Sequence, residues 1–304
     1  MLKYFEKSSG ITIYHDDNLD VLRGLPDGSI NLIYCDILYN TGKTFDDYDD
    51  NLGSPMEAAL WYRPRFIEMK RVLAHNGSIF IHCNWRLDSY IRILMDEIFG
   101  GNCFRNRIYR KHSGERGFYS NFDSQVDIIL YYVKNPKDFV FNEVHHKTPK
   151  VVPLFENGYI EERSWYQPIP GQQIVDLIHQ NKHWLVGHEQ LAQMIKNDEV
   201  RVINGLPYRF TTAASIGNLW DEPYMLDQYS RTHTAEAYDT PKPDAVLGRI
   251  IKICSNEGDT VADFFMGGGT TAVIAKKLKR KGIFCDISEK ACEVTIQKLK
   301  ALDN

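Results

Sequence analysis

The sequence predicts an α/β fold: a doubly wound, mainly parallel sheet that is interrupted by an inserted subdomain. Short apolar runs of strand length alternate with amphipathic segments over the first 135 residues, and the same alternation returns after residue 244. This alternation is typical of parallel sheets, because each parallel connection needs a crossover that is usually a helix. The chain has 304 residues, which is enough for one large domain or two smaller ones.

Local patterns place the elements of the first part. The expected strands are the apolar runs 11–14, 30–35, 78–82 and 125–133, and the expected helices are 18–25, 56–73 and 87–99. Pro64 falls inside the second helix, so we expect a kink or a restart there. Asn76–Gly77 predicts a turn before the strand 78–82, and Gly100–Gly101 closes the helix 87–99.

The alternation stops near Lys134 and resumes at Asp244. Between these points lie proline-rich turns, a polar helical segment near 186–197, and a hairpin signal at Asn204–Gly205. The returning elements are expected as helix 244–254, strand 260–264, helix 270–279, strand 282–286 and helix 288–301. We therefore predict three parts, which are residues 1–137, an inserted subdomain at 138–235, and residues 236–304.

The composition is that of a soluble globular protein, with 43% hydrophobic and 25% charged residues. No apolar stretch approaches the roughly 20 residues of a membrane span, and the first ten residues lack the apolar core of a secretion signal. The six cysteines are scattered without a Cys-x-x-Cys pair, so we expect buried free thiols. These observations predict a cytoplasmic protein without a membrane partner and without a metal site.

A net charge of −4 means that a nucleic-acid binder of this composition must gather its cations on one face. The segment 105–116 offers such a cluster, with an aromatic residue, Tyr109, between the cations. Cations neutralise phosphates and rings stack on bases. The predicted phosphate contacts are Arg105, Arg107, Arg110, Lys111 and Arg116. A solvated loop is the competing interpretation of this segment.

A glycine-rich turn follows the strand 260–264. Gly267 and Gly269 remove side chains that would keep a ligand away from the backbone, and the helix that begins near Thr270 offers free N–H groups. Asp286 ends the next strand, where a carboxylate can accept hydrogen bonds from ribose hydroxyls. This pattern indicates an adenosine-containing ligand. Because Gly-Gly-Gly-Thr-Thr-Ala also fits a loose dinucleotide pattern, NAD and S-adenosylmethionine both remain open here.

A carboxylate, a backbone carbonyl and an aromatic ring follow one another at the end of the strand 30–35. Asp36 supplies the carboxylate, Ile37 the carbonyl and Tyr39 the ring. An exocyclic base amine is a poor nucleophile because its lone pair is delocalised into the ring. Two acceptors on its N–H bonds favour a tetrahedral nitrogen that can attack a sulfonium methyl, so positioning and electrostatics do most of the catalysis.

Two motifs carry a resemblance to a known family. Residues 36–42, Asp-Ile-Leu-Tyr-Asn-Thr-Gly, are similar to the catalytic motif Asp-Pro-Pro-Tyr-Asn-Thr-Gly of the beta-class amino-group DNA methyltransferases. Residues 263–271, Asp-Phe-Phe-Met-Gly-Gly-Gly-Thr-Thr, are similar to that family's cofactor motif Asp-Pro-Phe-x-Gly-Ser-Gly-Thr-Thr. The catalytic motif precedes the cofactor motif, which is the beta-class order. The resemblance covers roughly residues 1–135 and 236–300.

The resemblance implies a Rossmann-like methyltransferase fold and S-adenosyl-L-methionine as the cofactor. It implies cofactor contacts at Asp17, which matches the family's acidic residue near the adenine, and at Lys242 in Thr240–Pro243, which resembles Thr-Gln-Lys-Pro. The same resemblance extends the cofactor set to Asp36, Asp263, Phe265, Gly267, Gly269, Thr270 and Asp286. It also implies that residues 138–235 recognise the target sequence in double-stranded DNA, and it makes a homodimer and a cognate restriction endonuclease expected partners.

The catalytic motif departs from the family pattern where both prolines are replaced, by Ile37 and Leu38. Proline lowers loop entropy, so the departure puts preorganisation of the loop in question, although Ile37 keeps its carbonyl. An aspartate that opens this motif usually accompanies adenine in the family, so the leading hypothesis is methylation of adenine N6. A base inside a duplex must first be flipped out of the stack.

Three other hypotheses stay open. Cytosine N4 poses the same chemical problem as adenine N6, so the same groups could methylate it. A DNA-binding protein that has lost catalysis would fit the altered motif at Ile37 and Leu38. A nicotinamide oxidoreductase would fit the glycine turn but not the Asp-x-x-Tyr motif. His82 ends a strand and is expected to be a satisfied structural histidine rather than a base.

Overall fold

The structure is a computed structural model that describes residues 1–44, 49–115, 122, 124–142, 150–153, 155–157, 182–184, 192–194, 196, 200–203, 206–211, 217–221 and 242–303. The chain divides into two compact units. The larger unit joins Met1–Asn142 with Gly217–Asn304, and the smaller unit is Glu143–Ile216. The two ends of the chain therefore build one unit together, as the interrupted alternation of strands and helices indicates.

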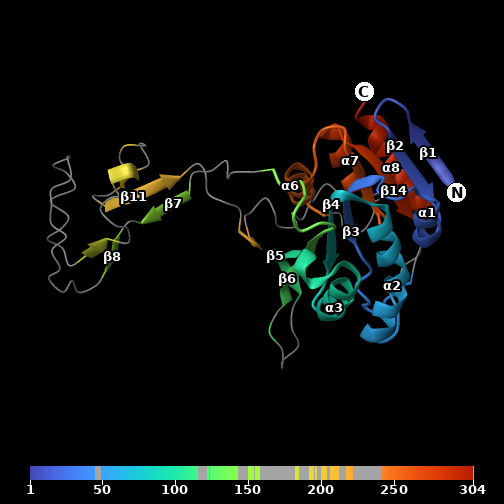
Figure 1. The fold of residues 1–304 in the computed structure, drawn as a ribbon, viewed down its shortest axis with the longest axis horizontal. Coiled ribbons are helices and arrows are strands. Elements are labelled where there is room, and N and C mark those ends of the chain that lie inside the picture. The colour runs from blue at the N-terminus through green and yellow to red at the C-terminus, as the bar shows by residue number, and fades with distance from the viewer. Residues whose placement is uncertain are drawn as a thin grey trace. The chain divides into compact units, whose positions relative to one another are not determined.

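The larger unit is built on a nine-stranded sheet in the order β1-β2-β14-β13-β3-β4-β6-β5-β12 (Figure 1). Pairing is parallel from β2 through β4 and between β5 and β12. It is antiparallel at the other three junctions, so the predicted mainly parallel sheet is confirmed. The strands are β1 (Leu2–Glu6), β2 (Ile11–His15), β3 (Ile30–Asp36), β4 (Leu73–Cys83), β5 (Phe104–Glu115), β6 (Ser124–Val133), β12 (Leu219–Trp220), β13 (Thr260–Asp263) and β14 (Lys281–Asp286).

Six α-helices are described in the larger unit, in two groups (Figure 1). They are α1 (Asn18–Gly24), α2 (Pro55–Val72), α3 (Asp88–Phe99), α6 (Asp244–Cys254), α7 (Thr270–Lys277) and α8 (Glu289–Ala301). The first three helices pack in sequence against one another, and so do the last three. Residues of α2 and α3 belong to the cluster on one face of the sheet and α6 packs on the other, and helices on both faces are the arrangement of a doubly wound sheet.

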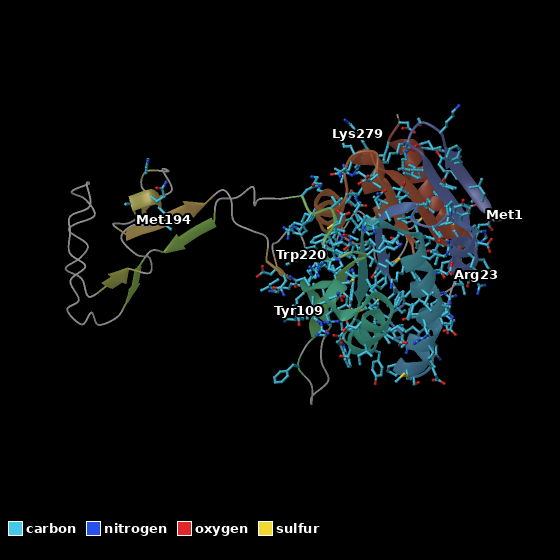
Figure 2. The ribbon with its side chains drawn as sticks, in the orientation of Figure 1. Met1, Arg23, Tyr109, Met194, Trp220 and Lys279 are labelled. Atoms are coloured by element: carbon cyan, nitrogen blue, oxygen red, sulfur yellow. The ribbon has the colours of Figure 1, made fainter. Side chains whose placement is uncertain are left out.

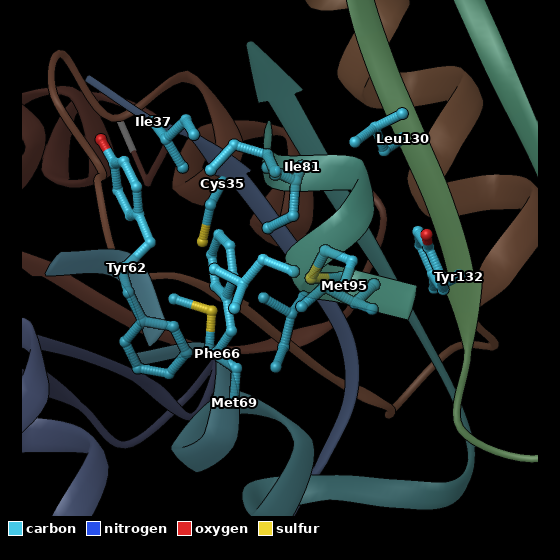
Figure 3. Packing of buried hydrophobic residues seen from close by; sticks show 14 of the residues in the cluster. Cys35, Ile37, Tyr62, Phe66, Met69, Ile81, Met95, Leu130 and Tyr132 are labelled. Atoms are coloured by element: carbon cyan, nitrogen blue, oxygen red, sulfur yellow. The ribbon is translucent and has the colours of Figure 1, made fainter. Parts of the chain in front are cut away.

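Alternate residues of β3 point to opposite faces of the sheet. Ile33 and Cys35 belong to the main hydrophobic cluster with Phe66 and Met69 of α2. Figure 3 shows the α2 side chains packed beside Cys35 and Ile81. Leu32 and Tyr34, which alternate with them, are buried as well, and burial on both faces explains why the strand reads as a continuous apolar run.

The other face of the sheet packs against α6. The Phe80 ring of β4 stacks on the Tyr131 ring of β6 with 4.3 Å between centroids, and the Cys254 thiol of α6 lies 3.6 Å from the Tyr131 hydroxyl. Tyr34 and Asp36 of β3 point to this second face, because they alternate with Ile33 and Cys35. All six cysteines are buried and free, as the sequence predicts.

Three local predictions need correction. The Asn76–Gly77 pair does not precede the strand but lies inside β4, where the pairing with β3 shifts register between Ile30 and Leu32. Helix α2 runs through Pro64 without a break, so the helix does not restart there. The segment 105–116 is not a solvated loop over its described part, because residues up to Glu115 form β5, an interior strand between β6 and β12.

The return from the inserted part lies earlier than the predicted boundary at 235/236. Leu219 and Trp220 form β12, which pairs in parallel with Tyr109 and Arg110 of β5. This edge of the sheet is where Figure 2 labels Tyr109 and Trp220. The hydrogen bonds of β12 place residues from Gly217 onward in the larger unit.

The smaller unit contains two small sheets, β10-β11-β7 and β8-β9. Their strands are β7 (Lys150–Pro153), β8 (Phe155–Asn157), β9 (Lys182–Trp184), β10 (Val200–Ile203) and β11 (Leu206–Thr211). The antiparallel pairing of Ile203 with Leu206 confirms the predicted hairpin around Asn204–Gly205. Only residues 192–194 and 196 of the predicted polar helix are described, and they are helical. Over the described residues, no helix is long and apolar enough to cross a membrane.

The packing of α2 gives a direct test of the core. Phe66→Ala should lower the free energy of unfolding by about 3–5 kcal/mol, because it empties a fully buried site in the main cluster. Leu60→Ala on the same helix is the matched control and should change stability by no more than about 0.5 kcal/mol, since Leu60 is 58% exposed. Urea denaturation measures both, and equal losses would contradict this description of the core.

Candidate active site

The glycine turn joins β13 to α7 at the carboxyl edge of the sheet. Gly267 and Gly269 both have left-handed backbone angles, with φ of 51° and 75°. A Cβ on Gly269 would also overlap the side chain of Thr295, so both the backbone angle and the lack of space require glycine at this position. The turn leaves the first N–H groups of α7 without side chains in front of them, as expected for a ligand-binding turn.

The buried Asp263 carboxylate stabilises the turn through two hydrogen bonds. One carboxylate oxygen accepts from the Phe265 N–H at 3.0 Å and the other from the Thr271 hydroxyl at 2.7 Å. The residue is buried, and burial raises the pKa of its carboxyl to about 7 against the opposing effect of these hydrogen bonds. Asp263 thus shapes the turn, although the sequence grouped it with the cofactor contacts.

Asp286 and Asp17 lie at the carboxyl ends of the neighbouring parallel strands β14 and β2. The Asp286 carboxylate accepts from the Gly267 N–H at 2.7 Å and from the Ser288 N–H at 2.9 Å. Asp17 caps α1 and receives the guanidinium of Arg65 at 2.9 Å. The carboxylates are therefore held in place by donors of the protein itself.

The predicted catalytic loop begins where β3 ends. The Tyr39 hydroxyl donates to Asp36 Oδ1 at 3.0 Å, and Lys242 Nζ lies 2.9 Å from Asp36 Oδ2. The same ammonium group lies 5.1 Å from the centre of the Tyr39 ring, within reach of a cation–π contact. Tertiary structure thus brings Lys242, more than 200 residues away in sequence, onto the Asp36 carboxylate.

Three hydrogen bonds to backbone groups anchor the start of this loop. The Ile37 N–H donates to the His82 carbonyl at 3.1 Å, a bond that a proline at this position could not make. The Tyr62 hydroxyl donates to the Leu38 carbonyl at 3.0 Å, and the Asn84 amide donates to the Tyr39 carbonyl at 3.1 Å. No residue that the structure describes donates to the Ile37 carbonyl, which leaves it available to a ligand.

Asp50 organises the second half of the loop and was not predicted from the sequence. Its buried carboxylate accepts from the N–H groups of Asn40 and Thr41, each at 2.9 Å, and from the Thr41 hydroxyl at 2.5 Å. Asn40 has a left-handed φ of 52°, a conformation that asparagine tolerates better than most residues. Its side chain in turn bonds Leu52 and Gly53.

A row of polar side chains continues from Asp36 beneath the loop, and the sequence did not predict it either. The fully buried His82 has Nδ1 2.7 Å from the Tyr34 hydroxyl and Nε2 3.3 Å from Asp127 Oδ2. Arg110 donates to the same Asp127 oxygen at 2.5 Å. Burial opposes ionisation of Asp127, but its pKa is lowered because His82, Lys242 and Arg110 together favour the charged form.

This row corrects one predicted DNA contact. Arg110 is 1% exposed and paired with Asp127, so it does not reach a phosphate from the protein surface. The reason is that β5 is an interior strand, so alternate residues face the core. Arg105 and Arg107 are half-buried, with Arg107 3.2 Å from Asp88, and Lys111 is exposed. Arg116 lies outside the described residues.

The glycine turn and the catalytic loop line one cavity of about 660 Å³ in the larger unit. Its wall includes all but one of the predicted catalytic and cofactor residues, namely Asp17, Asp36, Ile37, Tyr39, Lys242, Asp263, Phe265, Gly267, Thr270 and Asp286. Gly269 supports the turn from outside the wall. Tyr34 also lines this cavity.

The raised pKa of Asp263 predicts a pH dependence of stability. The folded state holds this proton more tightly than the unfolded state, so the stabilisation is fully present below pH 3.8 and is lost as the pH rises towards 7. Asp263→Asn cannot ionise. Wild type therefore loses stability as the pH rises from 4 to 7, whereas the variant does not. Over this range the difference in free energy of unfolding, variant minus wild type, should rise by up to about 4 kcal/mol. Denaturation curves at several pH values test this, and a constant difference would contradict it.

Comparisons with known proteins agree with this geometry. A family model for N6 and N4 methyltransferases, described as DNA methylase, matches residues 30–298. The chain is 29% identical over 314 residues to the type II methyltransferase M.EcaI of Enterobacter cloacae, with 94% of this chain and 68% of that protein covered. It is 27% identical over 297 residues to the DNA adenine methyltransferase YhdJ of Escherichia coli K12, with coverage of 95% and 82%.

The fold has relatives among solved structures. One is the DNA modification methylase TTHA0409 of Thermus thermophilus, solved in complex with S-adenosyl-L-methionine. It matches with a TM-score of 0.53 and 16% identity, and the match covers 95% of this chain and 93% of that one. The fold is therefore that of the DNA methyltransferases, as the resemblance implied. Since the family model spans both the catalytic loop and the glycine turn, the chain belongs to the DNA methylase family of amino-group methyltransferases.

Proposed function

We propose that this protein transfers a methyl group from S-adenosyl-L-methionine to N6 of a flipped adenine in double-stranded DNA. The observation that carries the proposal is the Asp36 carboxylate at the end of β3, which faces the cavity beside the Ile37 carbonyl and the Tyr39 ring. Family membership establishes an amino-group DNA methyltransferase and sets aside the nicotinamide oxidoreductase hypothesis. The 27% identity to an adenine methyltransferase supports adenine over cytosine.

The cavity fits the proposed cofactor. Its volume of about 660 Å³ lies within the roughly 300–1,000 Å³ that is usual for ligand pockets. The left-handed glycines open the backbone at Gly267, while Asp286 and Asp17 offer carboxylate oxygens for ribose and adenine. S-adenosyl-L-methionine would supply an electrophilic methyl group on a sulfonium. The ring of Phe265 lies 6.3 Å from that of Trp61, so the same wall also offers aromatic surface.

The loop residues can activate and orient the base. Asp36 and the Ile37 carbonyl would accept the two N–H bonds of the target amine, which frees its lone pair. Tyr39 would stack on the base, and its ring is held by its own hydroxyl bond to Asp36 and by Lys242. Lys242 holds the Asp36 carboxylate in place and leaves room for the amine, because the two carboxylate oxygens together have about four acceptor sites.

The smaller unit and the remaining partners belong to the same proposal. Residues of the inserted part would read the DNA sequence, and Lys111, Arg105 and Arg107 would neutralise phosphates along the DNA. A homodimer and a cognate restriction endonuclease stay predictions from the family resemblance. A catalytically silent relative is less well supported than an enzyme, because the Ile37 N–H and Asp50 hold the loop that lacks its prolines.

The nature of the methylated base is the first test. Unmethylated genomic DNA incubated with the protein and S-adenosyl-L-methionine should yield N6-methyladenine when its nucleosides are analysed by mass spectrometry. N4-methylcytosine would move the target to cytosine, whose amine the same two acceptors can bind. DNA and cofactor binding without any methylated base would instead indicate the silent relative.

The role of Asp36 is tested by Asp36→Ala. Loss of the carboxylate removes the acceptor for the target amine, so methylation should fall by at least about 10³-fold. Cofactor affinity should change by less than about threefold, because the glycine turn is built from other residues. Binding is followed by calorimetry and methylation by nucleoside analysis. Turnover retained in this variant would remove Asp36 from the mechanism.

Preorganisation of the loop is tested by Asp50→Ala. Without this carboxylate the N–H groups of Asn40 and Thr41 lose their acceptor, and the loop should lose its fixed geometry. We expect the first-turnover methylation rate to fall about 10–100-fold, because small displacements of reacting groups are costly. Asp138→Ala, an exposed carboxylate outside the cavity wall, is the control. Equal rates for the two variants would show that Asp50 does not preorganise the loop.

A further inference from the structure

The polar row beneath Asp36 contains three groups joined in the order carboxylate, imidazole and phenol. Asp127 Oδ2 lies 3.3 Å from His82 Nε2, and the Tyr34 hydroxyl lies 2.7 Å from His82 Nδ1. Tyr34 lines the cavity at the other end of this series. The row therefore leads from the cavity wall into the interior of the sheet.

Strand register explains why these residues meet. Asp36 of β3 lies opposite His82 of β4, and His82 lies opposite Ile129 of β6. Tyr34 and Asp127 are each two residues away from a member of this line, so all four polar side chains point to the same face. The alignment across β3, β4 and β6 is a property of the pairing and needs no loop movement.

The three groups are in the protonation states that a relay requires. Burial raises the pKa of Tyr34 well above its ordinary value, so the phenol is protonated and donates to Nδ1. Burial lowers the pKa of His82, so the imidazole is neutral and its Nδ1 can take a proton. With Nδ1 accepting from Tyr34, the ring proton is on Nε2, which faces the ionised Asp127. The Nε2 geometry is too oblique for a good hydrogen bond, so this contact is mainly electrostatic.

Charged groups surround His82 from every neighbouring element. Asp36 Oδ1 lies 3.8 Å from Nδ1, and the Tyr39 ring centre lies 6.3 Å from the imidazole centre. Beyond Asp127 lie Arg110 and His112 of β5, and Lys242 acts through Asp36. An imidazolium at this place would be flanked by two carboxylates, Asp36 and Asp127, which favours its formation during the reaction.

We propose that Tyr34, His82 and Asp127 form a proton relay that removes the proton released when the target amine is methylated. The inference rests on the proposed function only in needing an exocyclic amine as the target, whether on adenine or on cytosine. Tyr34 is the group that would contact the base, and His82 and Asp127 act through it.

The step balances as follows in atoms and electrons. The amine lone pair forms the N–C bond while the electron pair of the C–S bond goes to sulfur. As this bond forms, the amine becomes cationic and in the same step passes one N–H proton to the Tyr34 oxygen, while the phenol proton moves to His82 Nδ1. The imidazolium is stabilised by Asp127. After the product leaves, His82 Nδ1 returns a proton to the Tyr34 oxygen, and the phenol releases its other proton to water that enters the cavity.

The relay separates two roles: Asp36 binds the target amine, and His82 takes the proton that the amine releases. Asp36 already receives the Tyr39 hydroxyl and Lys242, so its oxygens serve as hydrogen-bond acceptors. The neutral imidazole of His82 lies behind it and can take the proton.

The test is the first-turnover methylation rate of Tyr34→Phe, measured with enzyme in excess over sites in unmethylated genomic DNA and read by nucleoside mass spectrometry. The rate should fall about 10²-fold or more, as for loss of general base catalysis, while cofactor and DNA affinity stay within about twofold. Tyr132→Phe is the matched control, because it removes a buried hydroxyl bonded to Asp96 on the opposite face of the sheet. It should methylate at the wild-type rate.

His82→Asn is the second variant, since asparagine can keep an acceptor near Tyr34 but cannot take the proton. Its rate should also fall about 10²-fold. Because burial lowers the pKa of His82 below its ordinary value of 6.5, the wild-type rate should drop only at a pH below that value, and this acid limb should vanish in the variant. A purely structural histidine would leave the shape of the pH profile unchanged.

The outcomes separate the relay from the proposed function. Wild-type product with a Tyr34→Phe rate within threefold of wild type would overturn the relay alone, and so would an acid limb that persists in His82→Asn. Wild-type product identified as N4-methylcytosine, with both variants slow, would support the relay and correct the target base. A wild-type protein that methylates no base would overturn the proposed function and the relay with it.

Discussion

The parallel pairing of β3 with β4 is the interaction on which the active site depends. It sets Asp36 opposite His82 and continues past the end of the sheet, where the Ile37 N–H bonds the His82 carbonyl. This last bond holds the first residue of the catalytic loop against a rigid strand. The carboxylate, the free Ile37 carbonyl and the start of the Tyr39 turn all take their positions from it.

The charges around this pairing alternate in sign across the sheet. Lys242 meets Asp36, and Asp127 meets Arg110, with neutral His82 between the two pairs. Burial of any one of these ions alone would be very unfavourable, but each has a partner of opposite charge within hydrogen-bond distance. The arrangement places a neutral imidazole between Asp36 and Asp127, which is the electrostatic basis for the proposed base activation and for the proposed relay.

The two ligand-binding loops reach fixed geometry by different means. The turn after β13 uses left-handed glycines, tied by the carboxylates of Asp263 and Asp286. The loop after β3 lacks the two prolines that its family usually has there. It uses Asp50 and a left-handed Asn40 instead, together with a backbone bond that proline would forbid. The replacement of Pro-Pro by Ile37–Leu38 is therefore accompanied by other restraints on the same loop.

The sequence by itself determined the alternation of strands and helices, the hairpin at 200–211, and the two motifs that line the cavity. These features depend on local periodicity and on residues that are neighbours in the chain, so a linear pattern records them. The linear pattern was less informative for β5, because the many cations of this strand make it resemble a surface segment. It was also less informative for β12, which consists of only two residues.

Tertiary structure alone decided the contacts between distant residues. Lys242 reaches Asp36 across some two hundred residues. Asp127 meets His82, and Arg110 meets Asp127, only because β6 and β5 follow β4 in the sheet. The spacing of motifs along the chain does not predict the order of strands in the sheet, since a sheet joins strands that are far apart in sequence. The physical reason is that hydrogen-bond register, not chain distance, sets which side chains share a face and an edge.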